Sequence, residues 1–195
     1  MKLILASSSP RRAEILRDAG ISFSVLSSAV DETPIPGETP RQHVQRLADA
    51  KGELAAARAL GPSLIISADT VVVLDGQILG KPRSTDEARR MLELLSGRTH
   101  SVITGITVQR LPEMERRQFI ETTLVHFNKL SSDGISRYLS TAEPYDKAGA
   151  YAIQGHAGRY IPRIEGCYFN VVGLPLAHLV ATLHELGWSE EPEPL

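Results

Sequence analysis

The sequence predicts an α/β fold with one mixed, twisted sheet and flanking helices, and three observations support this. Apolar runs typical of strands alternate along the chain with stretches of helical periodicity. Residues 64–74 form a long run rich in Val, Ile and Leu, which is typical of a strand covered on both faces. The Asp-Gly pair at 75–76 follows this run and indicates a hairpin, so we expect antiparallel as well as parallel strand pairs.

Length and composition fit one domain of ordinary globular type. The chain has 195 residues, 42% of them hydrophobic, which is enough for a sizeable core. We expect one domain of two lobes over 1–188 and a disordered tail over 189–195. A net charge of −2 argues against nucleic acid polymers and anionic membranes as partners. The single cysteine, Cys167, cannot form an internal disulfide, which fits a cytoplasmic protein.

The first strand and helix enclose a candidate anion site. Three serines at 7–9 separate an apolar strand from a helix that starts at Pro10, with Ser9 in the N-cap position. A helix N-terminus presents free amides and positive dipole charge, and Arg11 and Arg12 add two guanidiniums. We take Ser7, Ser9 and Arg12 as candidate phosphate-binding residues. An ordinary capped helix with two solvent-exposed arginines explains the pattern equally well.

After a short strand at 23–26, a long helix is predicted from about Pro40 to Leu60. Lys51 lies on its apolar face, either as a stem that snorkels to the edge or as a cation pointed into a polar pocket. Its mid-helix position favours the second interpretation. Glu32, in the preceding loop beside another acid, is either solvated or a metal ligand. The apolar face is marked by Val44, Leu47, Ala48, Leu54 and Ala55.

Asp69 interrupts the central apolar run. An ionised carboxylate inside a buried strand needs a metal, a cation or a proton, because desolvating it is costly. An Asp at a turn would need none, but the apolar run resumes directly after Thr70, so a functional carboxylate is favoured. Lys81, held extended by Pro82, is either an ordinary exposed lysine or a cation at the edge of a binding site.

The second half of the chain predicts further interleaved elements and one dense loop. The stretch 143–158 is rich in glycine and alanine, which indicates close approach of the backbone to a ligand or to another segment. Within it, Gln154 can donate and accept, so it suits recognition of a base edge, unless the stretch is simply a tight surface loop. The other elements expected are a helix at 84–97, a strand hairpin from 101–111 and 118–127, a short helix at 132–141, and a last helix from Pro175 to about Leu186.

Taken together, the cations and carboxylates describe a site for a polyanion and a divalent metal. Hydrolysis of a phosphoanhydride needs cations on the phosphates, a metal such as Mg²⁺ or Mn²⁺, and a group that activates water. No constellation around a serine or cysteine suggests a covalent nucleophile, so direct attack by water is the simpler mechanism. The residues concerned are Arg11, Arg12, Lys51 and Lys81 as cations, and Glu32 and Asp69 as carboxylates.

The segments LASSSPRR, ADTVV, LGKP, DKAGAYAIQG and NVVGLP, in this order, resemble the Maf family of nucleoside triphosphate pyrophosphatases. They span Leu5 to Pro175. The resemblance implies a Maf/Ham1-type fold (that of inosine triphosphate pyrophosphatase) with two lobes around a cleft, and it allows a homodimer. It implies metal-dependent cleavage of a triphosphate into a monophosphate and pyrophosphate.

Residue by residue, the resemblance makes Asp69 the proton acceptor and Glu32 a second acid, so that both are candidate metal ligands. Phosphate-binding cations map to Arg12, Lys51 and Lys81. Substrate-selecting positions map to Arg11, Thr70 and Gln154, a combination that resembles the dTTP/UTP branch. We therefore expect a house-cleaning enzyme for dTTP, UTP and modified pyrimidine triphosphates. The alternatives are a nucleotide-binding regulator of cell division and a 7-methyl-GTP pyrophosphatase.

Overall fold

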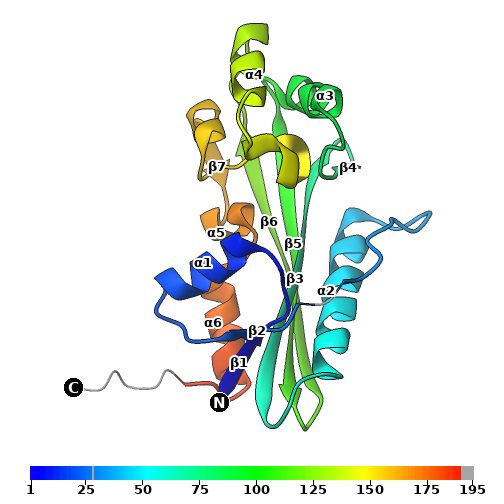
Figure 1. The fold of residues 1–195 in the computed structure, drawn as a ribbon, viewed down its shortest axis with the longest axis vertical. Helices are drawn as coiled ribbons and strands as arrows, with labels where there is room; N and C mark the ends of the chain where they lie inside the picture. The colour runs from blue at the N-terminus through cyan, green and yellow to red at the C-terminus, as the bar shows by residue number, and fades with distance from the viewer. Residues whose placement is uncertain (28, 190–195) are drawn as a thin grey trace. The chain divides into compact units, whose positions relative to one another are not determined.

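The computed structural model describes residues 1–27 and 29–189, and within them the predicted mixed α/β fold is confirmed (Figure 1). Seven strands form one sheet in the order β2-β1-β3-β5-β6-β7, with β4 paired to β3. Of the tail predicted at 189–195, only Ser189 lies inside the described residues. The described part contains no helix with both the length and the apolar character needed to cross a bilayer.

The chain forms two compact units, each built from separate segments. Unit 1 comprises Met1–Asp69, Thr104–Ile120 and the chain from Gly173 onward, and unit 2 comprises Thr70–Ile103 and Glu121–Val172. Strands β3, β5 and β6 contribute residues to both units. That the units act as the lobes of a single domain stays a prediction.

The strands of unit 1 are built around β3, which is buried along almost its whole length. All its positions are buried except Thr70, which is half-buried, as the long, largely apolar run predicts. Strand β1 pairs in parallel with both β2 and β3, and β5 lies on the other side of β3, so β3 is not an edge strand. The bounds are β1 Lys2–Leu5, β2 Ser24–Val25, β3 Ser63–Leu74, β5 Thr99–Leu111 and β6 Glu115–His126.

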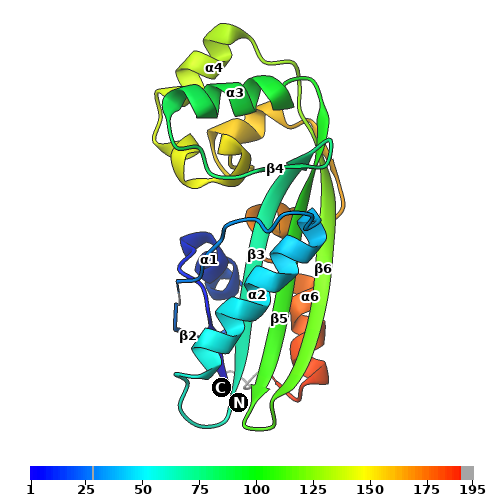
Figure 2. The same ribbon diagram turned by 90° about the vertical axis from the view of Figure 1, so that its right-hand side faces the viewer.

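Helix α2 lies on one side of β3, and α1 and α6 lie on the other (Figures 1 and 2). A capping box between Thr39 and Gln42 starts α2, because each side chain bonds the other residue's backbone N–H. A side chain at Gly105 of β5 would lie 2.8 Å from the Val44 carbonyl, so helix and strand pack backbone to backbone. The expectation for Leu54 is wrong, since it is 44% exposed, whereas the other four marked positions are buried. The bounds are α1 Pro10–Asp18, α2 Pro40–Ala56 and α6 Leu176–Glu185.

Unit 2 begins with the predicted hairpin. Asp75 and Gly76 both have positive φ, 50° and 78°, and Leu74 pairs with Gln77 across the turn, as the Asp-Gly pair predicts. Helices α3 and α4 fall where the sequence places them, whereas the short helix α5 was not predicted. The bounds are β4 Gln77–Leu79, α3 Thr85–Leu95, α4 Ser132–Leu139, three 3₁₀ turns η1 Glu143–Asp146, η2 Ala148–Ala150 and η3 His156–Tyr160, β7 Arg163–Glu165 and α5 Tyr168–Val172.

The glycine-rich stretch of unit 2 packs closely against the chain itself. Gly149 has φ of 68°, and a side chain there would lie 3.0 Å from the side chain of Val72. A side chain at Gly155 would overlap the carboxylate of Glu143. At these two positions the small residues are therefore explained by contacts within the protein.

Candidate active site

Asp69 obtains its compensating charge from Lys51. The carboxylate side chain is 11% exposed, and Lys51 Nζ, from the middle of α2, donates to its Oδ1 at 2.7 Å. The ammonium side chain is itself only 12% exposed. Of the two interpretations of this helical lysine, the structure therefore supports the one that directs the cation inward, toward carboxylate groups.

Glu32 shares the same ammonium group. Lys51 Nζ lies 2.6 Å from its Oε1, but the Glu32 side chain is 54% exposed. Two carboxylates from distant parts of the chain thus meet at one lysine, one on a buried strand and the other on an exposed loop. The loop carboxylate is the more accessible of the two and the less costly to move.

The loop that carries Glu32 is fastened to α2 through Glu38. Arg46 donates to both carboxylate oxygens of Glu38, at 2.6 and 2.9 Å, and to the Thr33 carbonyl at 3.2 Å. The hydrogen bonds from Arg46 lower the pKa of Glu38 to about 2, with a smaller contribution from His43, against a raising effect of burial. This contact between Glu38 and Arg46, which we call the Glu38 clamp, was not predicted from the sequence. The capping-box residues Thr39 and Gln42 at the start of α2 do mark where the loop ends.

Arg12 is buried at 8% exposure and is held by neutral acceptors. Its Nε donates to the Gly173 carbonyl at 2.8 Å, and its Nη1 donates to Ser7 Oγ at 3.1 Å and to the Ala68 carbonyl at 3.0 Å. Burial lowers the pKa of Arg12, while Asp69, close enough to act electrostatically, raises it. The interpretation of Arg12 as a solvent-exposed arginine is therefore wrong, and the neighbouring Ala68 carbonyl places it beside Asp69.

The start of α1 contributes uncapped backbone. Ser9 occupies the N-cap position, but its side chain makes no capping hydrogen bond, so its predicted capping role is wrong. Instead, Ser9 N donates to Ser7 Oγ at 3.2 Å, and this hydroxyl also accepts from Arg12. Arg11 is half-buried on the first turn of the same helix. The first helical amides and two guanidiniums thus lie together, as the anion-site hypothesis requires.

The remaining candidates belong to unit 2. Thr70 follows Asp69 directly on β3 and is half-buried, Lys81 is exposed just after β4, and Gln154 is exposed in the turn between η2 and η3. The roles assigned to these residues by resemblance stay predictions.

Glu32 and Asp69 offer carboxylate oxygens of the kind that Mg²⁺ binds, and their role as metal ligands stays a prediction. Among residues 1–27 and 29–189, no group of three or more His, Cys, Asp or Glu side chains could hold a metal. Mg²⁺, however, is usually bound by one or two carboxylates plus water and phosphate oxygens, rather than by a full protein cage. Two carboxylate oxygens converging on one ammonium group match that donor set.

Comparison with known proteins relates the whole chain to one family. Residues 2–186 match the family model described as Maf-like protein. A dTTP/UTP pyrophosphatase from Syntrophus aciditrophicus is 50% identical over 187 residues, which cover 95% of this chain and 90% of that protein. Another from Pelotomaculum thermopropionicum is 46% identical over 188 residues, covering 96% and 98%.

Solved structures support the fold. A Ham1 protein from Staphylococcus aureus aligns over 95% of this chain and all of that chain, with a TM-score of 0.53 and 17% identity. A HAM1 protein from Coxiella burnetii aligns over 95% and 99%, with a TM-score of 0.50 and 14% identity. At such identities the likeness concerns the architecture alone.

Proposed function

Because the chain belongs to the Maf family, we propose that it is a nucleoside triphosphate pyrophosphatase that hydrolyses dTTP and UTP to the monophosphate and pyrophosphate. The observation that carries the proposal is the buried Lys51, which joins Asp69 and Glu32 beside the buried Arg12. The names of the relatives, which are about half identical over nearly the whole chain, supply the reaction and the substrates.

In this proposal the cations hold the triphosphate. Arg12 is oriented by hydrogen bonds to two carbonyls and a hydroxyl, while Asp69 and Glu32 lie close enough to act on it electrostatically. A phosphate oxygen that approaches Lys51 competes with the carboxylates for its ammonium group. We also assign phosphate contacts to Ser7 and Ser9, from the sequence pattern at the start of α1, and to Lys81, from the resemblance.

Asp69 then acts on water. When a phosphate draws Lys51 away, Asp69 Oδ1 is released from its contact with the ammonium group and can accept the proton of an attacking water molecule. Water adds across the anhydride between the α and β phosphorus atoms, and the two products are the monophosphate and pyrophosphate. Glu32 and Asp69 would together hold Mg²⁺ or Mn²⁺, which neutralises phosphate charge when bound.

The test is pyrophosphate release from a panel of triphosphates with Mg²⁺. We expect turnover of dTTP and UTP, and a loss of about 10²- to 10⁴-fold in Asp69→Asn, the range typical of a lost general base. Asp75→Asn is the matched control, because it makes the same change at an exposed carboxylate in the turn that ends β3. Folded protein without turnover on any triphosphate would overturn the proposal, and tight binding without cleavage would favour a regulator.

Base selection is a separate element of the proposal. We assign it to Arg11, Thr70 and Gln154 from the resemblance, and substituting Thr70 and Gln154 should reduce turnover of UTP relative to 7-methyl-GTP. An unchanged ratio would remove both residues from selectivity. A homodimer and a cytoplasmic location are likewise proposals, the first resting on the resemblance and the second on the single cysteine.

A further inference from the structure

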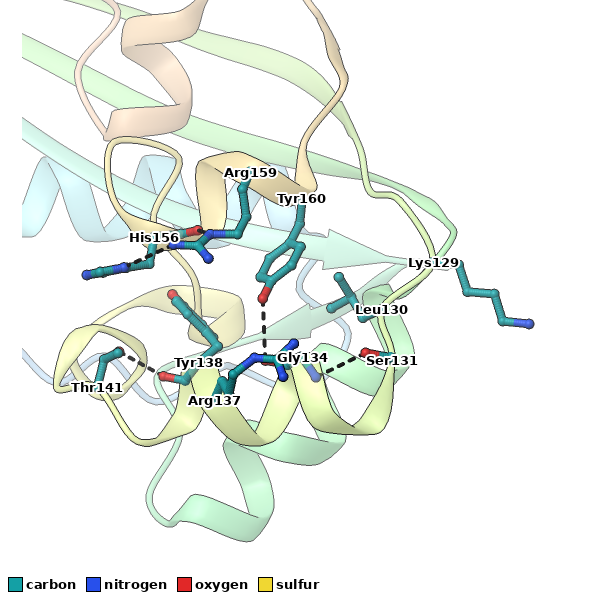
Figure 3. Close-up of a pocket in the computed structure, with 10 residues that line it drawn as sticks. All are labelled: Lys129, Leu130, Ser131, Gly134, Arg137, Tyr138, Thr141, His156, Arg159 and Tyr160. Carbon is teal, nitrogen blue, oxygen red and sulfur yellow. Dashed lines mark hydrogen bonds between the residues drawn. The ribbon is translucent and has the colours of Figure 1, made fainter.

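Unit 2 contains a cavity of about 320 Å³ between α4 and η3 (Figure 3). This volume lies at the lower end of the range of small-molecule sites, about 300–1,000 Å³. None of the residues that line it belongs to the candidate active site or to the five sequence segments that carry the family resemblance. His156 directly follows one of these segments. The proposed hydrolysis therefore leaves the cavity unexplained.

The lining of the cavity is basic. It includes Arg137 on α4, Arg159 and His156 on η3, and Lys129, and none of the ten lining residues is an Asp or a Glu. Figure 3 shows Arg159 extending from η3 toward α4, whereas the Lys129 ammonium points away from the cavity. Two guanidiniums from facing elements thus supply most of the positive charge.

One carboxylate, that of Glu143, forms hydrogen bonds with both walls of the cavity. Glu143 accepts hydrogen bonds from Tyr138 Oη at 2.8 Å and from the backbone N–H groups of His156 and Ala157 at 2.8 and 3.2 Å. These bonds tie η3 to α4, so the two walls are fixed relative to each other. They also disperse the charge of Glu143 over three donors.

Contacts with His156 orient the guanidinium of Arg159, and they leave hydrogen-bond donors at the cavity available for a ligand. Arg159 Nε donates to the His156 carbonyl at 3.0 Å, and its Nη2 lies 3.4 Å from His156 Nδ1, a contact that leaves other guanidinium N–H groups available. Tyr160, buried in part between the walls, keeps its hydroxyl 3.4 Å from the Gly134 carbonyl, which is a long hydrogen bond.

We propose that this cavity binds a small molecule bearing a phosphate group, with Arg137 and Arg159 as the phosphate contacts. Guanidiniums are suited to phosphate because their planar N–H groups match two oxygens at once. The volume is about ten times the roughly 30 Å³ that one water molecule occupies in the liquid, so it has room for the body of a sugar phosphate beside the phosphate group.

The experiment is an NMR titration of the full chain with inorganic phosphate, ribose 5-phosphate and ribose, at constant ionic strength. Saturable amide shifts at 129–141 and 156–160 are expected with both phosphates and not with ribose. In Arg137→Gln/Arg159→Gln, affinity at these amides should fall at least tenfold, as expected for the loss of charge-assisted hydrogen bonds. Arg90→Gln, which removes an exposed arginine of α3, should leave it unchanged.

Amides around Lys51 and Asp69 serve as the internal reference, because phosphate binding at the candidate active site shifts them in every variant. The inference is overturned if wild-type protein shows no saturable shift at 129–141 and 156–160, or if ribose alone produces it. It is also overturned if the double variant, with an otherwise superimposable spectrum, retains the wild-type affinity. Because the wild-type titration decides by itself, an unfolded variant would not leave the question open.

Discussion

Replacing Lys51 with methionine removes the ammonium group that Asp69 contacts and keeps most of the aliphatic stem. The carboxylate is left on a buried strand without its closest cation, at a site where its side chain is 11% exposed. Asp69→Asn removes the opposite charge. A double variant that combines the two changes gives the coupling free energy between Lys51 and Asp69, separated from the contact that Lys51 also makes with Glu32.

The expected magnitude follows from burial. Exposed ion pairs contribute about 0.2–1 kcal/mol, whereas hydrogen bonds to charged groups inside proteins contribute about 1.5–3 kcal/mol. Both side chains of the Lys51–Asp69 pair are close to nine-tenths buried and their atoms are 2.7 Å apart, so we place its coupling free energy near the middle of the second range, at about 2 kcal/mol. Lys51→Met should destabilise the protein by at least this amount, since it removes the cation that is hydrogen-bonded to the buried Asp69. Asp69→Asn should cost less, because Lys51 keeps its contact with Glu32.

The assay is urea unfolding of wild type, Lys51→Met, Asp69→Asn and the double variant, with the slope of the unfolding free energy against urea compared across all four. Arg98→Met and Asp75→Asn form the control cycle, because that pair is 2.6 Å apart but 44% and 68% exposed. Its coupling should stay below about 1 kcal/mol. A Lys51–Asp69 coupling no larger than the control would refute the argument that burial makes this pair strong.

Three further expectations can be checked by the same unfolding measurements. Glu38→Gln should cost stability at neutral pH through the lost Arg46 contacts, and because the folded pKa of Glu38 is lowered to about 2, that cost should shrink as pH falls from about 4.5 toward 2; a cost independent of pH would contradict the clamp. Burial lowers the pKa of His100 to about 4, so wild type should lose stability relative to His100→Gln as pH falls from about 6.5 to 4, where only the unfolded state gains the proton; parallel pH profiles would count against this. Gly105→Ala should destabilise by about 1–3 kcal/mol, because its added carbon meets the rigid backbone at Val44, and full stability would mean that helix and strand can separate.

Much of the fold could be predicted because residues close together in sequence determine many of its turns, helix starts and strands. The Asp-Gly turn, the capped starts of α2 and α3 and the long, largely apolar strand each depend on residues that are neighbours in sequence. Errors arose where tertiary contacts decide: Leu54 fits the helical period but lies exposed, and Ser9 stands in a cap position but its neighbour Ser7 bonds its backbone instead. Periodicity cannot tell which apolar positions find a partner.

The candidate site was only partly predictable for the same reason. That Asp69 needs a compensating group follows from its apolar surroundings, but that the group is Lys51 required the fold, because 18 residues separate the two. The acceptors of Arg12 were not predictable, since two of them are backbone carbonyls, which carry no signature in the identity of a residue. The contact between Glu38 and Arg46 was missed because no sequence motif indicates it.

The bond from Arg12 to the Gly173 carbonyl joins atoms 161 positions apart, and it sets a condition on how the protein is made. A ribosome exposes the first helix long before it synthesises the carbonyl that this guanidinium needs, so the arginine must remain hydrated while most of the chain emerges. The surroundings of Arg12 are therefore completed only once Gly173 has been synthesised. A chain that has not yet reached Gly173 should lack the bond that holds Arg12, the cation proposed to contact phosphate, in its buried position.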